Sequence, residues 1–397
     1  MTAKTILIAA LSGRGLAASA RRAGYLPLVA DAFGDSDTGE LAAEARCVKD
    51  AARIGFHAKP VFTALAELAA APARPPIGLV LGSGFEDRPK LIAALARRYR
   101  LIGNDASTVA RSKNPAALGA LLDALAIAHP ETRLAPPEKP GEWLSKRIGG
   151  SGGAHIVPAT VAERSPRRYF QRRLVGEPAS ALAIATRDGA HMVGISRQWI
   201  VGCGPRPYRY GGAVGPVRLA PAIEMSIRAA VEQLCGALGL VGLVAFDFLL
   251  VGTTPYLLDI NPRPSATLDV FDDATGSLFH AHLAACEGRA PQLPVLNGAR
   301  AAAVLYADPG PLAVASLSWP AWTADRPSPA TRIPRYRPIA TVFAAGETAE
   351  EAFRSCHRRL DVLGEMLYAQ APNRERSNNA EIQRPGPERF GARSQAR

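Results

Sequence analysis

The sequence DFLLVGTTPYLLDINPRP, residues 247–264, carries the clearest indication of fold and chemistry in this chain. Apolar residues dominate both of its ends and the turn-forming run GTTP separates them, which predicts a hairpin of two buried strands. Asp259 and Asn261 are two residues apart and so lie on one face of a strand, and Asp247 on the neighbouring strand can share that face. Two carboxylates and an amide oxygen are hard ligands that suit Mg²⁺ in contact with phosphates.

Arg263 follows these residues directly. Its planar guanidinium group can contact a phosphoryl group through two hydrogen bonds at once. The alternative interpretation is that Asp259 and Asn261 only cap the turn at the end of the strand. Burying acidic side chains on a hairpin is costly without cations nearby, and this favours the metal-binding interpretation.

A second candidate lies in the sequence LSKRIGGSGGAH, residues 144–155, where Lys146 is expected at the end of a short strand. The glycines that follow it are Gly149, Gly150, Gly152 and Gly153. Glycines let backbone N–H groups approach phosphate oxygens, and the lysine ammonium offsets the phosphate charge. Because the lysine precedes the glycines, this is not a Walker loop. A flexible turn is the alternative to a phosphate site.

The first quarter of the chain alternates apolar runs with helical stretches. Strands are expected at residues 5–10, 26–30 and 77–81, and helices at residues 16–23 and 90–98. This order is typical of a doubly wound parallel α/β unit, which we place at residues 1–105.

The rest of the chain predicts a mixture of helices and short strands. Helices are expected at residues 113–128, 221–238 and 348–366, and strands at residues 143–148, 169–175, 179–186, 243–251, 256–260, 301–306 and 339–344. Residues 372–397 are polar and rich in Arg, Asn and Pro, which predicts a disordered tail.

Composition limits the classes of function. The chain has 397 residues, of which 48% are hydrophobic and 21% charged, and this fits a globular protein of two or three domains. The net charge of +12 suits polyanionic small molecules such as nucleotides, while no stretch has the features of a specific nucleic-acid module. Five scattered cysteines argue against a disulfide framework or a zinc site. Without a signal-peptide pattern or an apolar run of about 20 residues, we expect a cytoplasmic protein with no membrane association.

Together these motifs resemble the ATP-grasp superfamily, specifically its carboxylate–amine/thiol ligases, over about residues 1–370. The resemblance implies an α/β fold with an α+β lid. In that fold the N-terminal doubly wound parallel domain, residues 1–105, precedes an ATP-grasp fold with antiparallel sheets. The lid and the central nucleotide and metal domain are expected at residues 106–295, and a C-terminal cap at residues 296–371.

The resemblance also implies roles for individual residues, with Lys146 and Arg263 as catalytic groups. The metal ligands fall on Asp247, Asp259 and Asn261, the phosphate loop on the four glycines, an earlier nucleotide lysine at a helix start on Lys113, and the adenine-binding segment on Gln171, Arg172 and Leu174. ATP and Mg²⁺ are the implied cofactors, with Mn²⁺ as a substitute for Mg²⁺.

Two departures from the family pattern concern the nucleotide. Many members have an acid at the position of Gln171, and Pro178 occupies the usual position of a ribose-binding glutamate. Residues 339–352 resemble the C-terminal cap of biotin-carboxylase-like members. Residues 11–14 and 82–87 resemble a carboligase branch that includes relatives of tyramine–glutamate ligase.

The implied reaction forms an acyl-phosphate on a small carboxylic acid and transfers the acyl group to an amine. Arg206 and Arg209, in a basic and aromatic loop, are candidates for binding a substrate carboxylate or phosphate. Glu86, which follows a parallel strand, is a candidate for binding a substrate amine. A solvated loop and a glutamate at a helix start are the respective alternatives. The sequence names neither substrate.

Other classes of function were weighed against the ligase. A nucleotide-binding regulator without ligase activity would not need both lysines and the metal acids. Gly13, Gly15 and Asp31 suggest a Rossmann-type NAD(P) oxidoreductase, but that fingerprint is incomplete. The basic tail allows nucleic-acid binding, and the sequence leaves a homodimer open.

Overall fold

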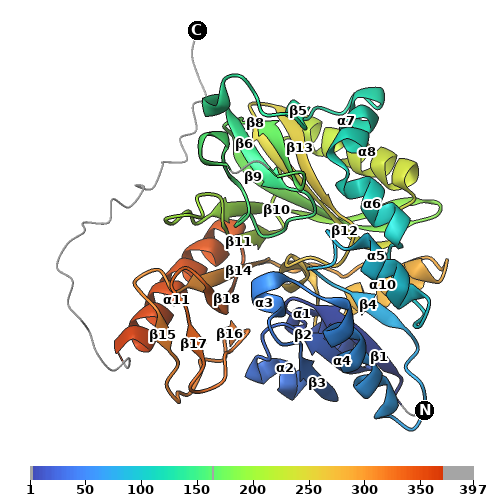
Figure 1. Cartoon of the computed structure of the whole chain (residues 1–397), viewed down its shortest axis with the longest axis vertical. Helices are drawn as coiled ribbons and strands as arrows, with labels where there is room; N and C mark the ends of the chain where they lie inside the picture. Colours follow the sequence, from blue (N-terminus) through green and yellow to red (C-terminus); the bar gives the residue numbers. More distant parts are fainter. Residues whose placement is uncertain (1–2, 163–164, 370–397) are drawn as a thin grey trace.

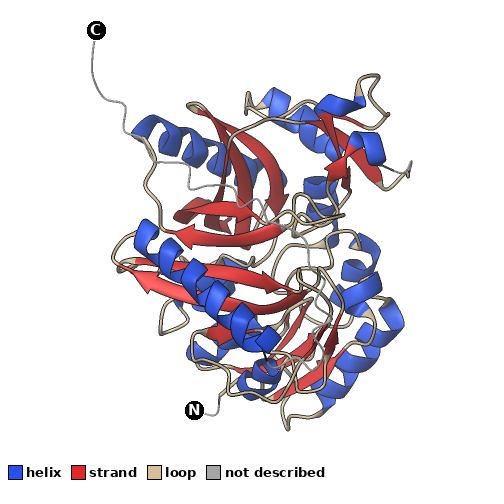
Figure 2. Cartoon of the chain, turned by 90° about the vertical axis from the view of Figure 1, so that its left-hand side faces the viewer, coloured by secondary structure: helices blue, strands red, loops and turns tan. Residues whose placement is uncertain are grey.

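The computed structural model describes residues 3–162 and 165–369. Figure 1 shows the N-terminal part below, a large sheet with a small lid sheet above, and the C-terminal part at the left. Figure 2, turned by 90°, shows strands gathered inside and most of the helices outside. The tail predicted to be disordered, residues 372–397, lies outside the described residues.

The N-terminal sheet has four parallel strands in the order β3-β2-β1-β4. The strands are β1 (Thr5–Ala10), β2 (Leu26–Asp31), β3 (Glu44–Cys47) and β4 (Leu79–Leu81), and the helices are α1 (Arg14–Arg22), α2 (Ser36–Leu41), α3 (Ala51–Ile54), α4 (Ala58–Ala70) and α5 (Pro89–Ala96). Strand β2 pairs with one edge of β1, and β4 pairs with the other edge. This arrangement confirms the predicted doubly wound unit. Strand β3 was not predicted, because Glu44 and Arg46 leave its four residues without an apolar run.

The large sheet has eight strands in the order β13-β12-β9-β10-β11-β14-β18-β16. They are β9 (Glu177–Thr186), β10 (Gly189–Ile200), β11 (Tyr210–Gly215), β12 (Gly242–Val251), β13 (Thr254–Asn261), β14 (Ala299–Tyr306), β16 (Thr323–Ala324) and β18 (Pro338–Gly346). All of its neighbouring strands are antiparallel. The hairpin predicted from residues 247–264 is therefore confirmed as β12 and β13.

Helices cover this sheet on its two faces. They are α8 (Pro221–Leu238), α9 (Leu268–Phe271), α10 (Ser277–Cys286) and α11 (Ala349–Ala369). On one face, Ile227 and Leu234 of α8 pack with Phe246 of β12. On the other, Phe279 of α10 shares a core with Ile8 of β1. This shared core fixes the N-terminal sheet against the large sheet, so that the ends of β1 and β4 face the space between them.

The lid is a small antiparallel sheet in the order β5-β8-β6-β7. Its strands are β5 (Thr132–Arg133), β6 (Trp143–Arg147), β7 (Val157–Pro158) and β8 (Arg168–Arg172), and two short 3₁₀ helices accompany it, η1 (Pro140–Glu142) and η2 (Ala159–Val161). The predicted strand over residues 169–175 thus ends earlier. A further pair, β15 (Leu312–Ala313) and β17 (Arg332–Ile333), lies in the C-terminal part.

The helix predicted at residues 113–128 is confirmed as α7 (Pro115–Ala124), which begins two residues later than predicted, and a further helix, α6 (Ala106–Lys113), ends just before it. Asn114 separates them, and its side-chain oxygen accepts hydrogen bonds from the N–H groups of Ala116 and Ala117 at 3.1 Å. Such capping by Asn starts a new helix. Lys113 therefore ends α6 instead of starting a helix.

Among the residues that the structure describes, no helix combines the length and the apolar character needed to cross a membrane.

Candidate functional site

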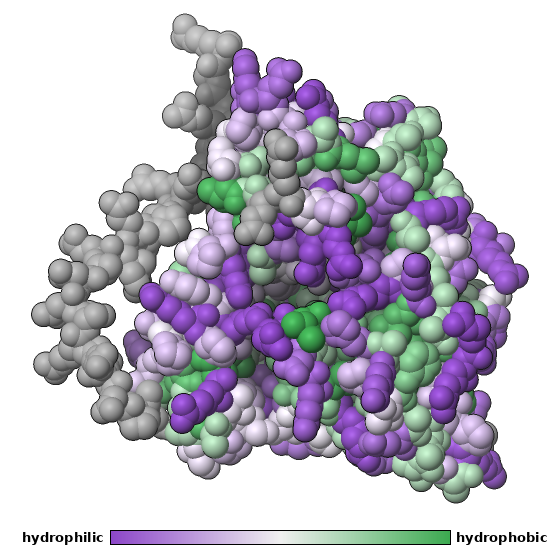
Figure 3. Space-filling view, in the orientation of Figure 1, coloured by the Kyte–Doolittle hydropathy of each residue, from purple (hydrophilic) through white to green (hydrophobic). Residues whose placement is uncertain are grey.

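A cavity of about 1080 Å³ lies between the lid, the large sheet and the N-terminal sheet. In Figure 3 hydrophilic side chains gather around a hollow near the centre of the visible face. Nearly all the residues that the sequence singled out line this cavity. They are Lys113, Lys146, Gly149, Gly150, Gly152, Gly153, Gln171, Arg172, Leu174, Arg206, Arg209, Asp247, Asp259, Asn261 and Arg263. Glu86 instead lines a small neighbouring cavity.

The two predicted metal acids face each other across the hairpin. Asp247 of β12 is paired in register with Asp259 of β13, so both side chains lie on the face that the spacing predicted. The Asn261 amide nitrogen donates a hydrogen bond to an Asp247 carboxylate oxygen at 2.8 Å. Burial and then the negative charge of Asp259 raise the pKa of Asp247. This position therefore favours a nearby cation.

Two lysines from different elements approach this pair. The Lys113 ammonium donates to both carboxylate oxygens of Asp259 at 2.8 Å. Lys146 on β6 is only 6% exposed and forms no hydrogen bond or ion pair with any residue that the structure describes. Burial lowers the pKa of Lys146, although Asp259 and Asp247 oppose that shift. A buried ammonium group that is open to a cavity is poised for an anionic ligand.

The donor set fits Mg²⁺ by its chemistry. Asp247 and Asp259 offer hard carboxylate oxygens from rigid strands, and Asn261 offers an amide oxygen on the same face. Within residues 3–162 and 165–369 no group of three or more His, Cys, Asp or Glu side chains could hold a metal ion. The third protein ligand would therefore be Asn261, whose amide oxygen accepts a hydrogen bond from Arg263 at 3.2 Å.

The glycine-rich loop contacts protein backbone on two sides. Gly149 has φ +68°, and a Cβ atom there would lie 2.7 Å from the backbone of Asp87. Gly153 has φ +70°, and a Cβ atom there would lie 1.9 Å from the Tyr208 carbonyl oxygen. These glycines are thus required for close packing against both neighbouring parts. The sequence predicted a phosphate loop or a flexible turn here, and neither prediction included this packing.

Glu86 holds Arg263 and does not face the main cavity. Its carboxylate is 4% exposed and accepts a hydrogen bond from the Arg263 guanidinium at 2.6 Å and another from the Gly84 N–H at 2.6 Å. Burial would raise the pKa of Glu86, but the charges of Arg263 and Lys113 hold it below its usual value. The prediction that Glu86 binds a substrate amine therefore gives way to an ion pair that orients Arg263.

The two loop arginines differ in their surroundings. Arg209 is 1% exposed, pairs with both carboxylate oxygens of Asp308 at 2.8–2.9 Å and stacks 3.6 Å from the centre of the Tyr306 ring. These contacts give Arg209 a structural role at the cavity wall. Arg206 donates a hydrogen bond to the Tyr336 carbonyl oxygen at 2.9 Å. Burial and the charge of Arg337 lower the pKa of Arg206, so Arg206 stays a candidate for binding an anion.

The predicted adenine segment lies along the lid. Gln171 is buried on β8 in register with Leu144 of β6. Arg172 points to the surface, where it pairs with Glu142 at 3.0 Å. Gln171 and Leu174 are therefore better placed to contact a base than the charged group of Arg172.

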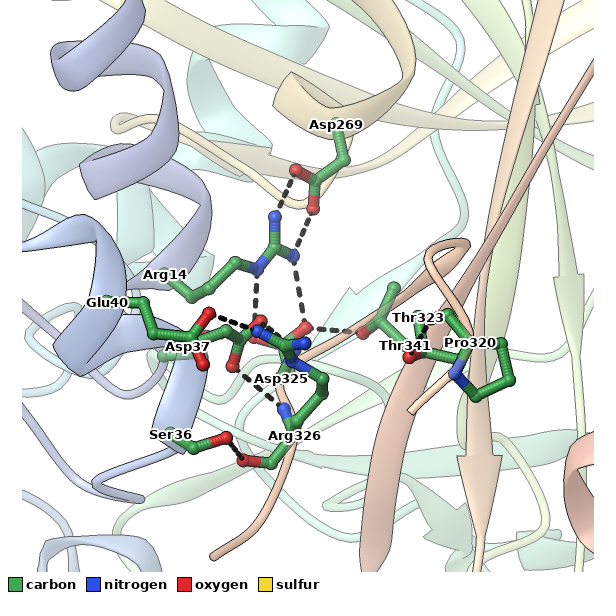
Figure 4. A network of polar contacts seen from close by, with 11 residues as sticks. Arg14, Ser36, Asp37, Glu40, Asp269, Pro320, Thr323, Asp325, Arg326 and Thr341 are labelled. Atoms are coloured by element: carbon green, nitrogen blue, oxygen red, sulfur yellow. Dashed lines mark hydrogen bonds and ion pairs between the residues drawn. The ribbon is translucent and has the colours of Figure 1, made fainter. Parts of the chain in front are cut away.

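A further group of carboxylates lines the same cavity and was not predicted from the sequence. Asp35, Asp269 and Asp325 line it and are called the acidic cluster below. They come from a loop after β2, from α9 and from the end of β16. No motif or spacing links them in the sequence, and Arg14 joins two of them in space, as Figure 4 shows.

The fold and the cavity define a class of structure in which a small lid sheet and a large antiparallel sheet border a cavity lined by carboxylates, lysines and a glycine-rich loop. Residues 117–267 match the family model of the ATP-grasp domain. This part of the chain is an ATP-grasp domain, and the enzymes of that superfamily use ATP and Mg²⁺ as cofactors.

Known proteins similar to this chain agree with that assignment. The carbamoyl phosphate synthase large chain of Myxococcus xanthus is 23% identical over 235 residues, which are 53% of this chain and 22% of that protein. The chain thus spans about a fifth of the length of the curated relatives that it matches.

Solved structures share the fold. The biotin carboxylase domain dimer of Hydrogenobacter thermophilus 2-oxoglutarate carboxylase, in complex with MgADP, ADP and bicarbonate, has a TM-score of 0.68 at 12% identity, with 90% of each chain covered. The L-amino acid ligase of Bacillus licheniformis has a TM-score of 0.66 at 14% identity, with 91% of this chain and 98% of that chain covered.

Proposed function

We propose that this protein is an ATP- and Mg²⁺-dependent ligase that forms an acyl-phosphate on a small carboxylic acid and transfers the acyl group to an amine. The observation that carries the proposal is the meeting of Asp247, Asp259, Lys113 and Lys146 in one cavity. The similarity to an L-amino acid ligase supports the formation of a C–N bond.

In this proposal the residues of the chain position phosphate groups and offset their charge. Asp247, Asp259 and Asn261 would hold Mg²⁺, which when bound spreads the charge of the phosphate oxygens. Lys146 and Lys113 offset the remaining charge from the lid and from the end of α6. Positioning and electrostatics of this kind account for most of the catalysis in phosphoryl transfer.

Arg263 has the second role in this proposal. It follows the metal-binding strand, and Glu86 and Asn261 fix its guanidinium group at 2.6 and 3.2 Å. An arginine held in this way can stabilise the charge on the phosphoryl oxygens during attack by the substrate carboxylate. The proposal also includes a division of the chain into three domains, with boundaries near residues 105 and 295. Each of these three parts supplies residues to the cavity.

The first test is a calorimetric titration of ATP with and without Mg²⁺. It compares the wild type, the double variant Asp259→Ala/Asn261→Ala, and a control variant, Asp188→Ala, which removes an exposed carboxylate outside the cavity. We expect Mg²⁺-dependent micromolar binding in the wild type and the control, and loss of that binding in the double variant. No nucleotide binding in the wild type would overturn the proposal.

The second test looks for the acyl-phosphate itself. Hydroxylamine replaces the acceptor amine, and a panel of small carboxylic acids is screened for phosphate release together with hydroxamate. We expect both products from at least one acid. ATP binding with neither product from any acid favours the alternative of a nucleotide-binding regulator.

The oxidoreductase alternative has less support. Asp31, the acid of the incomplete dinucleotide fingerprint, is buried and does not line the main cavity. A homodimer stays a prediction for this chain.

A further inference from the structure

The acidic cluster lies where the N-terminal sheet opens into the cavity. Ser12 follows β1 and Gly82 follows β4, and both line this end together with Asp35. The order of the strands reverses between β1 and β4. Open α/β sheets bind ligands outside the carboxyl ends of the strands at such a reversal. The position of the cluster is therefore that of a ligand site.

Two members of the cluster share one arginine. The Arg14 guanidinium donates two hydrogen bonds to Asp269 at 2.6 Å and contacts Asp325 at 3.0–3.3 Å, as Figure 4 shows. Asp325 also accepts hydrogen bonds from the hydroxyl groups of Ser12 and Thr341. One guanidinium charge thus serves two carboxylates, and both of these carboxylates still line the cavity.

Asp35 has no such partner. It is 8% exposed and lines the cavity, and its side chain forms no hydrogen bond or ion pair with any residue that the structure describes. Burial, followed by the negative charges of Asp325, Asp31 and Asp37, raises the pKa of Asp35 to about 8. A buried carboxylate in this position is costly without a positive charge.

Arg326, which follows Asp325 directly in the sequence, does not supply that positive charge. Its guanidinium group pairs with Glu40 at 2.5 Å and lies 3.9 Å from Asp37. An ammonium group of an organic ligand in the cavity can supply that charge, because it offers three N–H donors to the carboxylates around it.

We propose that Asp35, Asp269 and Asp325 form a subsite for a protonated amino group of the acceptor substrate. This inference rests on the proposed ligase function, because it names the class of the amine. Carboxylates stabilise the charged form of a neighbouring ammonium group, so the nitrogen held here stays protonated and does not attack the acyl group. The acceptor therefore carries a second amine, which is the nucleophile.

The position of the acidic cluster relative to Arg263, which is proposed to contact the phosphoryl group, supports this geometry. Asp269 follows Arg263 by six residues, and both side chains line one cavity. An acceptor anchored at the cluster by one amino group would extend toward Arg263 with its other end. The substrate class is thus a diamine or another acceptor with two basic groups.

The test uses a matched pair of probes, 1,5-diaminopentane and 1,5-pentanediol, which have equal length and differ in charge. Each is titrated calorimetrically into the full-length protein, with and without Mg²⁺ and a non-hydrolysable ATP analogue. We expect the diamine to bind at least tenfold more tightly than the diol. Equal binding of both probes would overturn the proposal, because Asp35 would then act as a neutral hydrogen-bonding group.

The variants locate the binding. Asp35→Asn is expected to weaken diamine binding at least tenfold while the affinity for Mg²⁺ and nucleotide is retained. The matched control is Glu40→Gln, which removes a carboxylate from α2, the helix that follows Asp35 directly, but outside the cavity. Equal loss in both variants would contradict the subsite. If Asp35→Asn does not fold, as judged by circular dichroism, Asp35→Ser takes its place.

Two further outcomes separate this inference from the proposed function. Displacement of the diamine by MgCl₂ alone would identify a metal site and overturn the inference. With an acid that gives a hydroxamate, 1,5-diaminopentane should release phosphate faster than pentylamine, and equal rates would overturn the inference while the ligase stands. Diamine binding without nucleotide binding would overturn the ligase and leave only the cation site.

Discussion

Two groups of carboxylates line the same cavity and are built in different ways. Asp247 and Asp259 lie on adjacent strands, opposite each other in the register of one hairpin. The acidic cluster comes from three separate segments, and two of its members meet only through Arg14. The first group is fixed by backbone hydrogen bonds, and the second is fixed by side chains.

The two groups also differ in how their charge is balanced. Lys113 contacts Asp259, and Lys146 lies buried nearby. At the acidic cluster, Arg14 serves Asp269 and Asp325, while Asp35 has no partner among the described residues. A rigid and balanced group suits chemistry shared by a whole superfamily, whereas carboxylates carried by separate short segments are free to set the choice of substrate.

The largest effect is expected from Asp247→Asn. The amide keeps the size of the side chain but removes one metal carboxylate, so the rate of ATP-dependent phosphate release should fall by roughly 100- to 1000-fold, the usual loss for one preorganised electrostatic group. Initial rates at a series of Mg²⁺ concentrations measure it. If the rate and the Mg²⁺ requirement are both unchanged, the metal binds elsewhere. The hairpin carboxylates would then have no metal-binding role that sets them apart from the acidic cluster.

The substitution Asp37→Ala tests the contacts that hold the backbone of Asp325, a member of the acidic cluster, in place. The Asp37 carboxylate accepts hydrogen bonds from the backbone N–H groups of Asp325 and Arg326, both at 2.9 Å, and Asp325 has φ +52°. Leaving two partly buried donors without acceptors should lower the free energy of unfolding by about 2 to 4 kcal/mol. Urea unfolding measures the loss, and Asp37→Asn, which keeps one acceptor, should lose less. A loss equal in the two variants would argue against this role.

Glu86→Gln tests the residue that orients Arg263, the arginine proposed to contact the phosphoryl group. The amide can still accept from Arg263 but no longer balances its charge, so we expect kcat to fall by about tenfold while KM for ATP stays nearly unchanged. Steady-state kinetics separate the two constants. If KM for the amine rises instead and kcat holds, Glu86 contacts the acceptor, as the sequence first suggested.

How far the sequence predicts this molecule follows from the range of each interaction. The spacing of Asp259 and Asn261 predicts a shared face because strand periodicity is local, and the hairpin that brings Asp247 to that face is also local. The helix α6, which ends at Lys113, was missed because its eight residues, ASTVARSK, contain one large apolar side chain and so show no apolar periodicity. The sequence gives the residue types of the glycine loop but not its contacts with Asp87 and Tyr208.

Long-range contacts lie beyond such reasoning. Ser12 and Asp325 form a hydrogen bond across 313 residues of sequence, and Arg263 and Glu86 do so across 177. Nothing in the neighbourhood of Asp35 indicates that it will be buried without a partner, because that depends on where α9 and the β16 end are placed. The acidic cluster therefore had to be found in the structure.

The smallest effect is expected from the pH dependence of stability in Asp35→Asn. Burial and neighbouring carboxylates raise the pKa of Asp35 to about 8 in the folded protein, while an unfolded chain has an Asp pKa of about 3.9. Between these two values the folded state binds more protons than the unfolded state, so the contribution of Asp35 to stability falls as pH rises from about 4 to about 8.

The variant has no such group, so its unfolding free energy relative to that of the wild type should rise between pH 4 and pH 8 to 9. The unpaired N–H groups of the new amide cost stability at every pH, so we expect the variant to be the less stable protein near pH 4 and the more stable one by about 1 to 2 kcal/mol at the higher pH. Urea unfolding at pH 4.5 and pH 8.5 measures it. Adding 1,5-diaminopentane at pH 8.5 should stabilise the wild type and close the gap, because the bound cation compensates Asp35. A gap that the diamine leaves unchanged would mean that the charge of Asp35 is not the one that the ligand meets.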